Sequence, residues 1–555
     1  MLTQNEILTI ISQLPFQVQA SSFEMAGELL IFTLTFNTGQ KTIPFKVTIS
    51  PLYPFHYMGQ ESISFFNENL KEYSHIMEEG NLCMHTPSDH DAQSKFHDDV
   101  IQLHDWVVRY YINGEKDLHY EDIVVNESKI GGHYMCYAIP LSERPNLNKD
   151  FGIAFFKTLS PSIHHETVCA NYLVYAFQSL FPKTTADNIP LSSIYRTFGV
   201  DDAIAPFVIL KSHPSDFGKF AIKDIPTLSS LMTQEQLQFI CHLLRENADN
   251  NTPQYVPIFI GYPTVRNKIG WLSLMIERGN LPWHGEPEKI NGIKTGKWLS
   301  IPNKDAEAVY AKTEILTPEL YYGRGAFPTS FVHSKILILG LGAIGSILTR
   351  TLAKCGCRNL TIYDFDVKAF GNCCRSEYDF HRGYGDKQNE LSFQLAYSHP
   401  FVDVHLLPHD FDTSIKAAFQ NGDYESITKC LDQYNYIFDC TTDDDLAYIL
   451  DQLQISCEII NLSISNHANQ LVCGFSPKIS EFLNFAFSKL VKIDENNDLY
   501  NPTGCWNPTF KASYNDINSL LQYAIKRIVR MISAQEPKHN FILSDNNEGI
   551  KIERI

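Results

Sequence analysis

From residue 335 onward, short apolar runs alternate with stretches long enough to form helices. The runs KILILG, NLTIYDFD, VDVHLL, YNYIFDC and EIINLSI have the length and apolar content of buried strands. Such runs, separated by helical lengths, are typical of a parallel sheet covered by helices. A later stretch, NDINSLLQYAIKRIVRMI, has the period of a helix, and we expect Asn515 or Asn518 to cap it. The pattern therefore predicts an α/β domain in residues 321–555.

The hydrophobic pattern differs in the two preceding regions. Residues 1–125 hold a short helix, the strand-like runs LLIFTLTF and TIPFKVTIS, and a helical stretch around VIQLHDWVVRYYI, which together predict an α+β domain. Residues 126–320 mix runs such as FGIAFF, APFVILK and VPIFIGYP with helical segments, and we expect a central α/β linker domain there. Glycine and proline cluster at 279–303 and predict a linker at that point. The expected fold class is α/β, in three parts.

Composition narrows the classes of function. The 555 residues are 44% hydrophobic and 12% aromatic, which excludes a mostly disordered chain. A net charge of −18 disfavours nonspecific binding to nucleic acid or to anionic membranes. No apolar segment approaches the ~18 residues of a membrane helix, and the opening MLTQNEILTIISQL lacks the basic region of a signal peptide. The 13 cysteines include no CxxC pair, so we expect a cytoplasmic protein with reduced thiols and no zinc site.

The string KILILGLGAIGS joins a predicted strand to a predicted helix through Gly340, Gly342 and Gly345. In a nucleotide-binding βαβ unit the first glycine makes the tight turn, and the second lets the backbone approach a phosphate. The third lets the helix pack closely on its strand. The helix N-terminus then offers amide donors and a positive dipole to the phosphates. This context predicts a Rossmann-like nucleotide-binding domain.

Polar residues beyond the second strand extend this site. The run NLTIYDFD carries Asp364, 19 residues after Gly345, where a carboxylate suits ribose hydroxyls. Four further polar residues follow: Asp366, Asn372, Arg375 and Lys387. They exceed what hydride transfer needs and suit nucleotidyl transfer, with cations for a triphosphate and a carboxylate for its magnesium. An acidic cluster, residues 443–445, follows the run YIFDCTT and predicts another ligand loop.

These motifs resemble those of the ThiF/MoeB/HesA and ubiquitin-activating-enzyme adenylation family. The likeness lies in the pattern DFDxxxxxNxxR and in the GYGDK string that follows it, and it covers about residues 335–480. It implies an enzyme that binds ATP and magnesium and adenylates the C-terminal carboxylate of a ubiquitin-fold protein, releasing pyrophosphate. It also implies a homodimer formed through the adenylation domain.

The same resemblance assigns roles to individual residues. The residues that it assigns to the nucleotide are Asp364 for the ribose, and Asn372, Arg375 and Lys387 for the phosphates. The metal-associated aspartate of the family follows a strand that reads Asp-Cys-Thr. Here an extra threonine, Thr442, shifts the register, so that the magnesium residue would be Asp443 or Asp444.

A second resemblance lies in residues 40–110. The stretch IPFKVTISPLYPFHY, with its YPF turn, and the segment from Gly80 to Cys83 resemble ubiquitin-conjugating enzymes. The resemblance implies that Cys83 forms a thioester. A cysteine in that role must be accessible and must attack and leave as a thiolate. The alternative is a buried, inert cysteine.

This N-terminal region departs from the family at one motif. His75 stands where the His-Pro-Asn motif of conjugating enzymes begins, but Ile76 and Met77 replace the proline and the asparagine. In that family the asparagine helps to stabilise the oxyanion of the attacked thioester. Asn81, His85 or a main-chain amide would have to take its place.

A third candidate is Cys505, in the proline- and glycine-rich stretch NPTGCWNPTF. A cysteine in a loop just after an adenylation domain can attack the acyl-adenylate and form a first thioester. The stretch resembles the crossover-loop cysteine segment of activating enzymes. The alternative is a structural cysteine that packs under Trp506.

Joined in this order, the two regions resemble bacterial activating/conjugating fusion enzymes, especially those of CBASS antiphage operons. The resemblance implies that the substrate is a ubiquitin-like protein or the C-terminal tail of a cGAS-like nucleotidyltransferase, and that an amine of a target protein receives it. Two other classes stay open. One is a small-molecule enzyme, either a sulfur-carrier adenylyltransferase or an NAD-dependent oxidoreductase. The other is a binding module with a degenerate conjugating domain.

Overall fold

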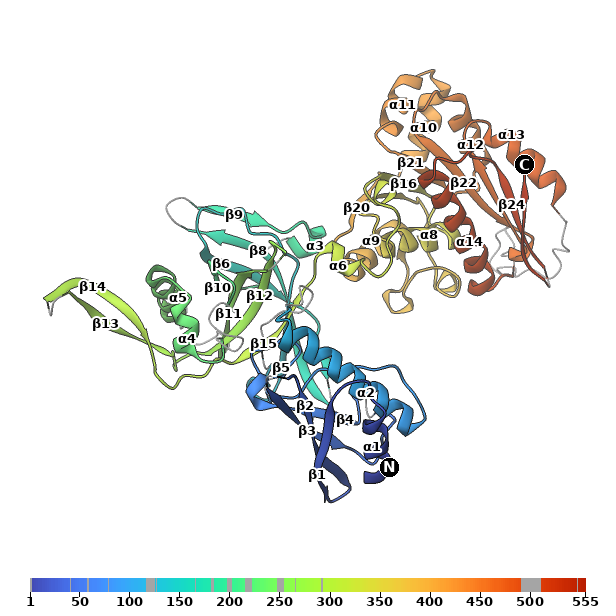
Figure 1. Cartoon of the computed structure of the whole chain (residues 1–555). Coiled ribbons are helices and arrows are strands. Elements are labelled where there is room, and N and C mark those ends of the chain that lie inside the picture. Colours follow the sequence, from blue (N-terminus) through green and yellow to red (C-terminus); the bar gives the residue numbers. More distant parts are fainter. Residues whose placement is uncertain are drawn as a thin grey trace. The chain divides into compact units, whose positions relative to one another are not determined.

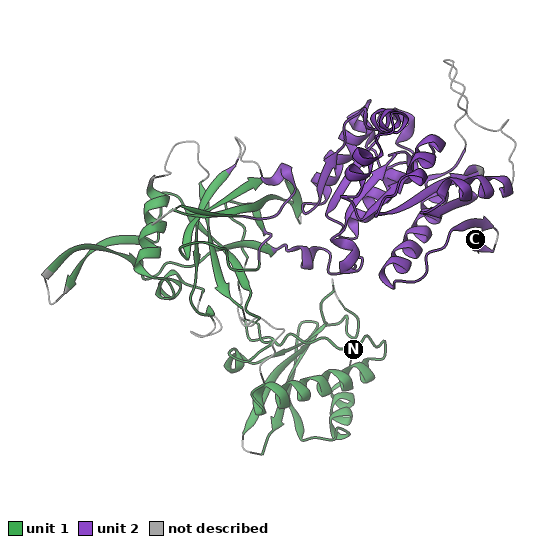
Figure 2. Ribbon diagram, turned by 90° about the horizontal axis from the view of Figure 1, so that it is seen from above, with its two compact units in different colours: residues 1–138, 142–187, 203–314 green, residues 139–141, 188–202, 315–555 purple. Residues whose placement is uncertain are grey.

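The computed structural model describes the chain except for residues 1, 40, 57–58, 78, 116–124, 126, 165, 181–183, 197–201, 215–221, 247–253, 265, 291–292, 491–510 and 547. The chain divides into two compact units; Figure 1 labels their elements and Figure 2 colours them separately. The first unit consists of residues 1–138, 142–187 and 203–314, and the second of residues 139–141, 188–202 and 315–555.

The N-terminal part of the first unit is a four-stranded antiparallel meander packed against helices. Strict alternation along β2 buries Phe32, Leu34 and Phe36 on one face of the sheet. Helix α1 begins with a capping box between Thr3 and Glu6. The elements are α1 (Gln4–Ser12), β1 (Val18–Ala26), β2 (Leu29–Asn37), β3 (Thr42–Ile49), β4 (Ile63–Phe66), α2 (Ala92–Trp106) and the π-helix η2 (Val107–Ile112).

The rest of the first unit is built on a nine-stranded sheet. Its order is β5-β15-β12-β11-β10-β6-β8-β7, with β9 on β8, and β5 also pairs with β8. Most pairs are antiparallel, whereas β10–β11 and β5–β8 are parallel. Helices α4 (Ile225–Ser230) and α5 (Gln234–Glu246) pack on β10, β11 and β12. The strands are β5 (Tyr134–Ile139), β6 (Phe151–Thr158), β7 (Ser162–His164), β8 (Thr167–Ser179), β9 (Thr185–Asn188), β10 (Ala203–Ile209), β11 (Tyr255–Pro263), β12 (Ile269–Glu277) and β15 (Tyr310–Ile315).

The described residues within 279–303, predicted as a linker, form two paired strands instead, and that prediction was wrong. Strands β13 (Trp283–Ile290) and β14 (Ile293–Pro302) pair antiparallel along their length. Their prolines are tolerated because this sheet has only two strands, each with one edge outside the ladder. The signal for a hairpin was the Asn-Gly pair between two isoleucines, which is typical of a two-residue turn.

The second unit contains an eight-stranded sheet in the order β20-β17-β16-β21-β22-β23-β24-β25. The first five strands are parallel, as the sequence pattern predicts, and the last three continue the sheet antiparallel. The strands are β16 (Lys335–Leu339), β17 (Asn359–Tyr363), β20 (Asp403–Leu406), β21 (Tyr436–Asp439), β22 (Glu458–Ser465), β23 (Gln470–Phe475), β24 (Phe541–Asn546) and β25 (Gly549–Arg554).

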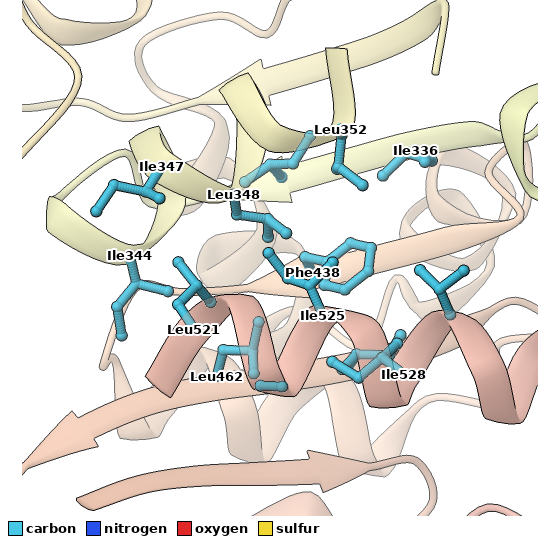
Figure 3. Packing of buried hydrophobic residues seen from close by; sticks show 14 of the residues in the cluster. Ile336, Ile344, Ile347, Leu348, Leu352, Phe438, Leu462, Leu521, Ile525 and Ile528 are labelled. Carbon is cyan, nitrogen blue, oxygen red and sulfur yellow. The ribbon is translucent and has the colours of Figure 1, made fainter. Parts of the chain in front are cut away.

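Helices cover both faces of this sheet. Ile336 and Ile338 of β16 lie in the apolar cluster under α8, α9 and α14, whereas Leu337 and Leu339 lie in the cluster under α10 to α13. Figure 3 shows side chains of α8 and α14 gathered around Phe438 of β21. The helices are α8 (Ala343–Lys354), α9 (Lys387–Ser398), α10 (Phe411–Gln420), α11 (Tyr424–Leu431), α12 (Asp444–Gln452), α13 (Ile479–Lys489) and α14 (Tyr514–Ser533).

The N-terminal cap of α14 differs from the prediction. Ser513, rather than Asn515 or Asn518, is the cap, and it forms a capping box with Asp516. Serine followed three residues later by an acidic residue satisfies two backbone donors at once, which a single asparagine cannot do. Across the part of the chain that the structure describes, no helix is both long enough and apolar enough to cross a bilayer.

Candidate active site

The turn after β16 explains the spacing of its glycines. Gly340 has a φ of +81°, and a Cβ on it would lie 2.8 Å from backbone atoms of Cys440 and Thr441. A Cβ on Gly345, in α8, would lie 1.8 Å from the carbonyl oxygen of Gly340. Gly342 is the N-cap of α8, and the space beside its Cα is open. Close contacts therefore require glycine at positions 340 and 345, whereas Gly342 leaves the N-terminus of α8 open to a ligand.

A pocket of about 440 Å³ lies at the carboxyl ends of β16, β17 and β21. Because β16 lies between β17 and β21 in the sheet, this is the topological switch point, where open α/β sheets bind their ligands. Gly345 packs behind the turn, and Asp444 is exposed on α12 outside the pocket lining. The other residues predicted for the nucleotide line the pocket: Gly340, Gly342, Asp364, Asp366, Asn372, Arg375, Lys387 and Asp443.

Asp364 is nearly buried and anchors the glycine turn. Its Oδ2 accepts a hydrogen bond from the amide of Leu341 at 2.7 Å, and its Oδ1 accepts one from the amide of Asp366 at 2.8 Å. The hydroxyl of Tyr378 donates to the carbonyl oxygen of Leu341 at 2.6 Å. Asp364 thus holds the turn in place, in addition to the ribose role that stays a prediction.

Lys387, the first residue of α9, forms ion pairs with the acids after β17. Its ammonium lies 2.6 Å from Oδ2 of Asp366 and 3.7 Å from Oδ2 of Asp364. Burial tends to raise the pKa of Asp366, but the bonds from Lys387 and from the amide of Val367 lower that pKa below its ordinary value. A cation is therefore held in the pocket by a carboxylate, with which a phosphate can compete.

The stretch between these charges is held by a small sheet and a buried lysine. β18 (Val367–Lys368) pairs antiparallel with β19 (Gly385–Asp386). The side chain of Lys368 is 1% exposed, and its ammonium donates to the carbonyl oxygen of Asp379 at 2.9 Å. These contacts close the stretch into a loop that returns to the pocket.

Asn372 and Arg375 reach the pocket from this loop. Asn372 ends a short 3₁₀-helix, and its Oδ1 accepts a hydrogen bond from the amide of Ala369 at 2.8 Å. Its carbonyl oxygen accepts one from the amide of Arg375 at 3.3 Å. The two predicted phosphate ligands are therefore tied to each other through the backbone.

The two candidates for the magnesium residue separate in the structure. Asp443 caps α12 through bonds from the amides of Asp445 and Leu446 at 3.0 and 3.1 Å, and it lines the pocket. Asp444 is the first residue of the helix and is exposed. The extra residue, Thr442, adopts a φ of +57° just before the cap. Only Asp443 of this pair lines the pocket; its role toward a metal stays a prediction.

Helix α10 contributes two charged residues that sequence reasoning missed. The ammonium of Lys416 lies 2.6 Å from Oδ2 of Asp443 and 3.1 Å from Oδ2 of Asp412, which also lines the pocket. Burial tends to raise the pKa of Asp443, but the bonds from Lys416 and from the amides of Leu446 and Asp445 hold it below its ordinary value. The available signal was the i, i+4 spacing of Asp412 and Lys416 on a helix after the run VDVHLL.

Asp439, at the end of β21, is buried beneath the pocket and organises the loop above it. It accepts bonds from the amide and the hydroxyl of Thr441 at 3.0 and 2.6 Å, and from the side-chain amide of Asn461 at 2.9 Å. The hydroxyl of Thr441 in turn accepts a bond from the amide of Asp443 at 3.1 Å. Burial raises the pKa of Asp439, and these bonds oppose the rise. The position of Asp443 thus depends on a buried acid.

Carboxylate oxygens of the pocket decide whether its residues suit a magnesium ion. Oδ1 of Asp412 is buried and has no hydrogen-bond partner among the described residues. Two carboxylates, Asp412 and Asp443, together with phosphate oxygens suit an ion that keeps several of its waters. Within the described ranges, no group of three or more His, Cys, Asp or Glu side chains is arranged to hold a metal ion. The residues therefore fit an ion held jointly with a triphosphate.

Cys83 is exposed and follows a tight turn. Its amide donates to the carbonyl oxygen of His75 at 2.8 Å. Gly80 has a φ of +97°, and a Cβ on it would lie 3.0 Å from the Cα of Glu68. The Gly-x-x-Cys spacing therefore reflects a turn that needs glycine. The group that replaces the missing asparagine of the conjugating-enzyme motif stays a prediction.

Cys505 lies outside the described residues, so its role in a first thioester is untested. Among the cysteines that are described, Cys83 and Cys374 are exposed. Cys374 belongs to the loop that carries Asn372 and Arg375, and its thiol lies 3.3 Å from the carbonyl oxygen of Gly371. It is a natural control for experiments on Cys83.

Comparison with known proteins identifies the class of the C-terminal part. Residues 328–473 match the model of the ThiF family, so this part of the chain is a ThiF family domain. The match covers β16 to β22 and most of β23, the strands that frame the pocket.

Particular relatives are similar over parts of the chain. The ATP-dependent ubiquitin transferase-like protein Cap2 of Enterobacter hormaechei subsp. hoffmannii is 25% identical over 311 residues, which are 50% of this chain and 47% of Cap2. The molybdopterin-synthase adenylyltransferase of Escherichia coli is 26% identical over 124 residues, 22% of this chain and 45% of that protein. The chain thus spans about half the length of these relatives. A crystal structure of E. coli MccB with AMPCPP and MccA has 14% identity and a TM-score of 0.28, and covers 41% of this chain and 64% of MccB.

Proposed function

We propose that this chain adenylates the C-terminal carboxylate of a small protein and passes the acyl group through cysteine thioesters to an amine of a target protein. The observation that carries the proposal is one pocket at the strand ends, lined by the cations Arg375 and Lys387 and by the carboxylate of Asp443. The ThiF family match and the similarity to Cap2 support it.

In the adenylation step, an oxygen of the substrate carboxylate attacks the α-phosphorus of ATP. The bond from that phosphorus to the oxygen that bridges to the β-phosphate breaks, and pyrophosphate leaves. Arg375 and Lys387 offset the charge that develops on the phosphates, and Asp364 orients the ribose. Asp443 and Asp412 would hold magnesium, which supplies positive charge at the phosphate oxygens.

Two thioesters would follow. The thiolate of Cys505 attacks the acyl-adenylate and AMP leaves; the thiolate of Cys83 then attacks that thioester and Cys505 leaves as thiolate. Finally, an amine of the target attacks the second thioester and releases Cys83. Each thioester retains much of the free energy of ATP cleavage and frees the adenylation site for another cycle. Joining both activities in one chain raises their effective concentration.

The substrate in this proposal is a ubiquitin-like protein or the C-terminal tail of a cGAS-like nucleotidyltransferase, in antiphage defence, and the enzyme acts as a homodimer. The similarity to a molybdopterin-synthase adenylyltransferase favours one alternative, adenylation of a sulfur carrier without a conjugation step. An NAD-dependent oxidoreductase and a binding module with a degenerate conjugating domain are further alternatives. Pyrophosphate exchange that requires a protein C-terminus separates adenylation from hydride transfer.

The proposal is tested with the purified chain, MgATP and the ubiquitin-like or nucleotidyltransferase protein encoded beside it. Non-reducing gels compare wild type with Cys83→Ala, Cys505→Ala and the control Cys374→Ala. We expect a thiol-sensitive adduct that Cys505→Ala abolishes and that Cys83→Ala retains at Cys505. An adduct lost only in Cys83→Ala would imply direct loading from the adenylate.

Two results would redirect the proposal. Exchange of pyrophosphate without any adduct would favour the sulfur-carrier alternative or show that the carrier supplied is not the true one. Loss of the adduct in Cys374→Ala would move the first thioester to the pocket loop. Absence of both exchange and adduct, with the true carrier present, would refute the pocket as an adenylation site.

A further inference from the structure

A fully buried lysine lies in the N-terminal part of the first unit. Lys95, on α2, is 0% exposed, and its ammonium lies 2.8 Å from Oδ1 of Asp99 and 3.1 Å from Oε2 of Glu61. Burying a charged amine is costly unless carboxylates compensate it. Burial tends to lower the pKa of Lys95, but the bonds to Asp99 and Glu61 raise it above its ordinary value. These three residues form a charged cluster inside the fold.

The cluster joins segments that are distant in the sequence. The hydroxyl of Tyr53, from the turn after β3, donates to Oδ2 of Asp99 at 2.7 Å. Thr86, from the coil before α2, hydrogen-bonds through its hydroxyl to both Asp99 and Lys95. The amide of Thr86 donates to Oε1 of Glu61 at 3.3 Å. Lys95 and Asp99 therefore contact the hydroxyl of Thr86, and Glu61 contacts its backbone amide.

Cys83 lies between two fixed points of the chain. On its N-terminal side, its own amide is bonded to the carbonyl oxygen of His75 at 2.8 Å. Residues 83–89 have no regular secondary structure, and Thr86 ties this coil to the charged cluster. Two residues separate Cys83 from Thr86. So short a tether keeps the thiol near one position for as long as the bonds of Thr86 persist.

We propose that Lys95, Asp99 and Glu61 act through Thr86 to hold the thiol of Cys83 at the surface in the position for thioester exchange. This inference rests on the proposed function of Cys83. Lys95, Asp99, Glu61 and Thr86 act through Cys83 and are therefore positioning residues. A satisfied ion cluster suits this task because its directional bonds select one arrangement of the coil, whereas apolar contacts permit several.

The test compares Thr86→Val with Thr86→Ser. Valine keeps the shape and removes the hydroxyl, leaving buried charges without one partner, whereas serine retains it. We measure the rate at which iodoacetamide alkylates Cys83, by peptide mass spectrometry, and the hydrogen exchange of residues 83–89. We expect Thr86→Val to lower the rate at which Cys83 is alkylated by at least about threefold. We also expect it to speed the hydrogen exchange of residues 83–89. Thr86→Ser is expected to stay near wild type.

These measurements need neither ATP nor a carrier protein, so they stand even where the proposed function fails. With an active carrier, Thr86→Val is also expected to lower kcat for transfer from Cys83 about tenfold with KM unchanged, as for a misplaced group. Alkylation in Thr86→Val at the wild-type rate or faster overturns the inference, as does an equal effect of Thr86→Ser. Should Thr86→Val not fold, Tyr53→Phe takes its place, because it removes a hydroxyl that bonds Asp99. Slower alkylation of Cys83 in Tyr53→Phe supports the inference, and alkylation at the wild-type rate or faster overturns it.

Discussion

The ammonium of Lys387 lies 2.6 Å from the carboxylate of Asp366 at the wall of the pocket. The lysine side chain is 11% exposed, so most of its desolvation has already occurred in the fold. A phosphate that replaces Asp366 as the partner of Lys387 exchanges one anion for another. Binding a triphosphate therefore requires less desolvation of this cation than if the lysine began in water.

Replacing Lys387 tests whether this cation serves the nucleotide. Lys387→Gln is expected to lower the rate of ATP–pyrophosphate exchange by about 100-fold, because a preorganised charge at the phosphates is lost. The matched control is Lys429→Gln, an exposed lysine on α11. An exchange rate for Lys387→Gln within about twofold of the control would assign the lysine to the structural pair with Asp366 alone.

The neighbouring acids Asp443 and Asp444 provide a second matched pair. Asparagine keeps the capping oxygen that α12 needs, so Asp443→Asn removes charge with little loss of helix stability. We expect Asp443→Asn to lower exchange by about tenfold or more and to raise the magnesium concentration required. Asp444→Asn, which changes an exposed residue outside the pocket, is expected to leave both unchanged. The reverse ranking would place the metal residue one position later.

The parallel part of the second unit was predictable because its inner strands are buried on both faces, whereas the edge strand β20 is partly exposed. Runs such as those around Ile338 and Phe438 are apolar throughout, and helical lengths separate them. The antiparallel strands β23, β24 and β25 were not predicted. No helix joins β24 to β25, and both α13 and α14 lie between β23 and β24, so the spacing of one helix between consecutive strands that marks βαβ units is absent. The hairpin at 279–303 was missed because proline and glycine indicate linkers as well as turns.

The pocket residues that were predicted belong to short local motifs: the glycine turn with Gly340 and Gly342, the stretch from Asp364 to Lys387, and Asp443 after the run YIFDCTT. Lys416 and Asp412 were missed because their relation to Asp443 exists only through the packing of α10 beside α12. The burial of Lys95 was likewise unpredictable, since a lysine on an amphipathic helix is usually solvated. Two of its partners are Glu61, which precedes β4, and Thr86, in the coil after Cys83, and only the fold brings them to Lys95.

Close packing at the glycine turn leads to a third prediction. A Cβ on Gly345 would lie 1.8 Å from the carbonyl oxygen of Gly340, whereas a Cβ on Gly325 would meet nothing within 4 Å. Gly345→Ala must displace the turn and is expected to reduce stability by about 2–4 kcal/mol and to abolish nucleotide binding. Gly325→Ala is expected to change stability by less than about 0.5 kcal/mol. Thermal unfolding and ATP titration measure both, and equal behaviour of the two variants would contradict the packing.

His399, just after α9, is a buried histidine outside the proposed chemistry. Its side chain is 5% exposed, and neither ring nitrogen has a hydrogen-bond partner among the described residues. Burial, together with the positive charges of Arg350 and Lys354, lowers its pKa from 6.5 to about 4. The folded chain therefore keeps this ring neutral over a range in which the unfolded chain protonates it.

The sign of the pH dependence follows from this difference. Between pH 6.5 and about 4 the unfolded state binds the extra proton, so the free energy of unfolding falls as the pH falls. Over this range the contribution of His399 is about 2–3 kcal/mol. His399→Gln cannot titrate, so its urea unfolding between pH 7 and 4 is expected to depend less steeply on pH than that of wild type, while the exposed His381→Gln keeps the wild-type slope. Parallel slopes for wild type and His399→Gln would mean that the ring is protonated in the folded chain, and that a partner for it forms in solution.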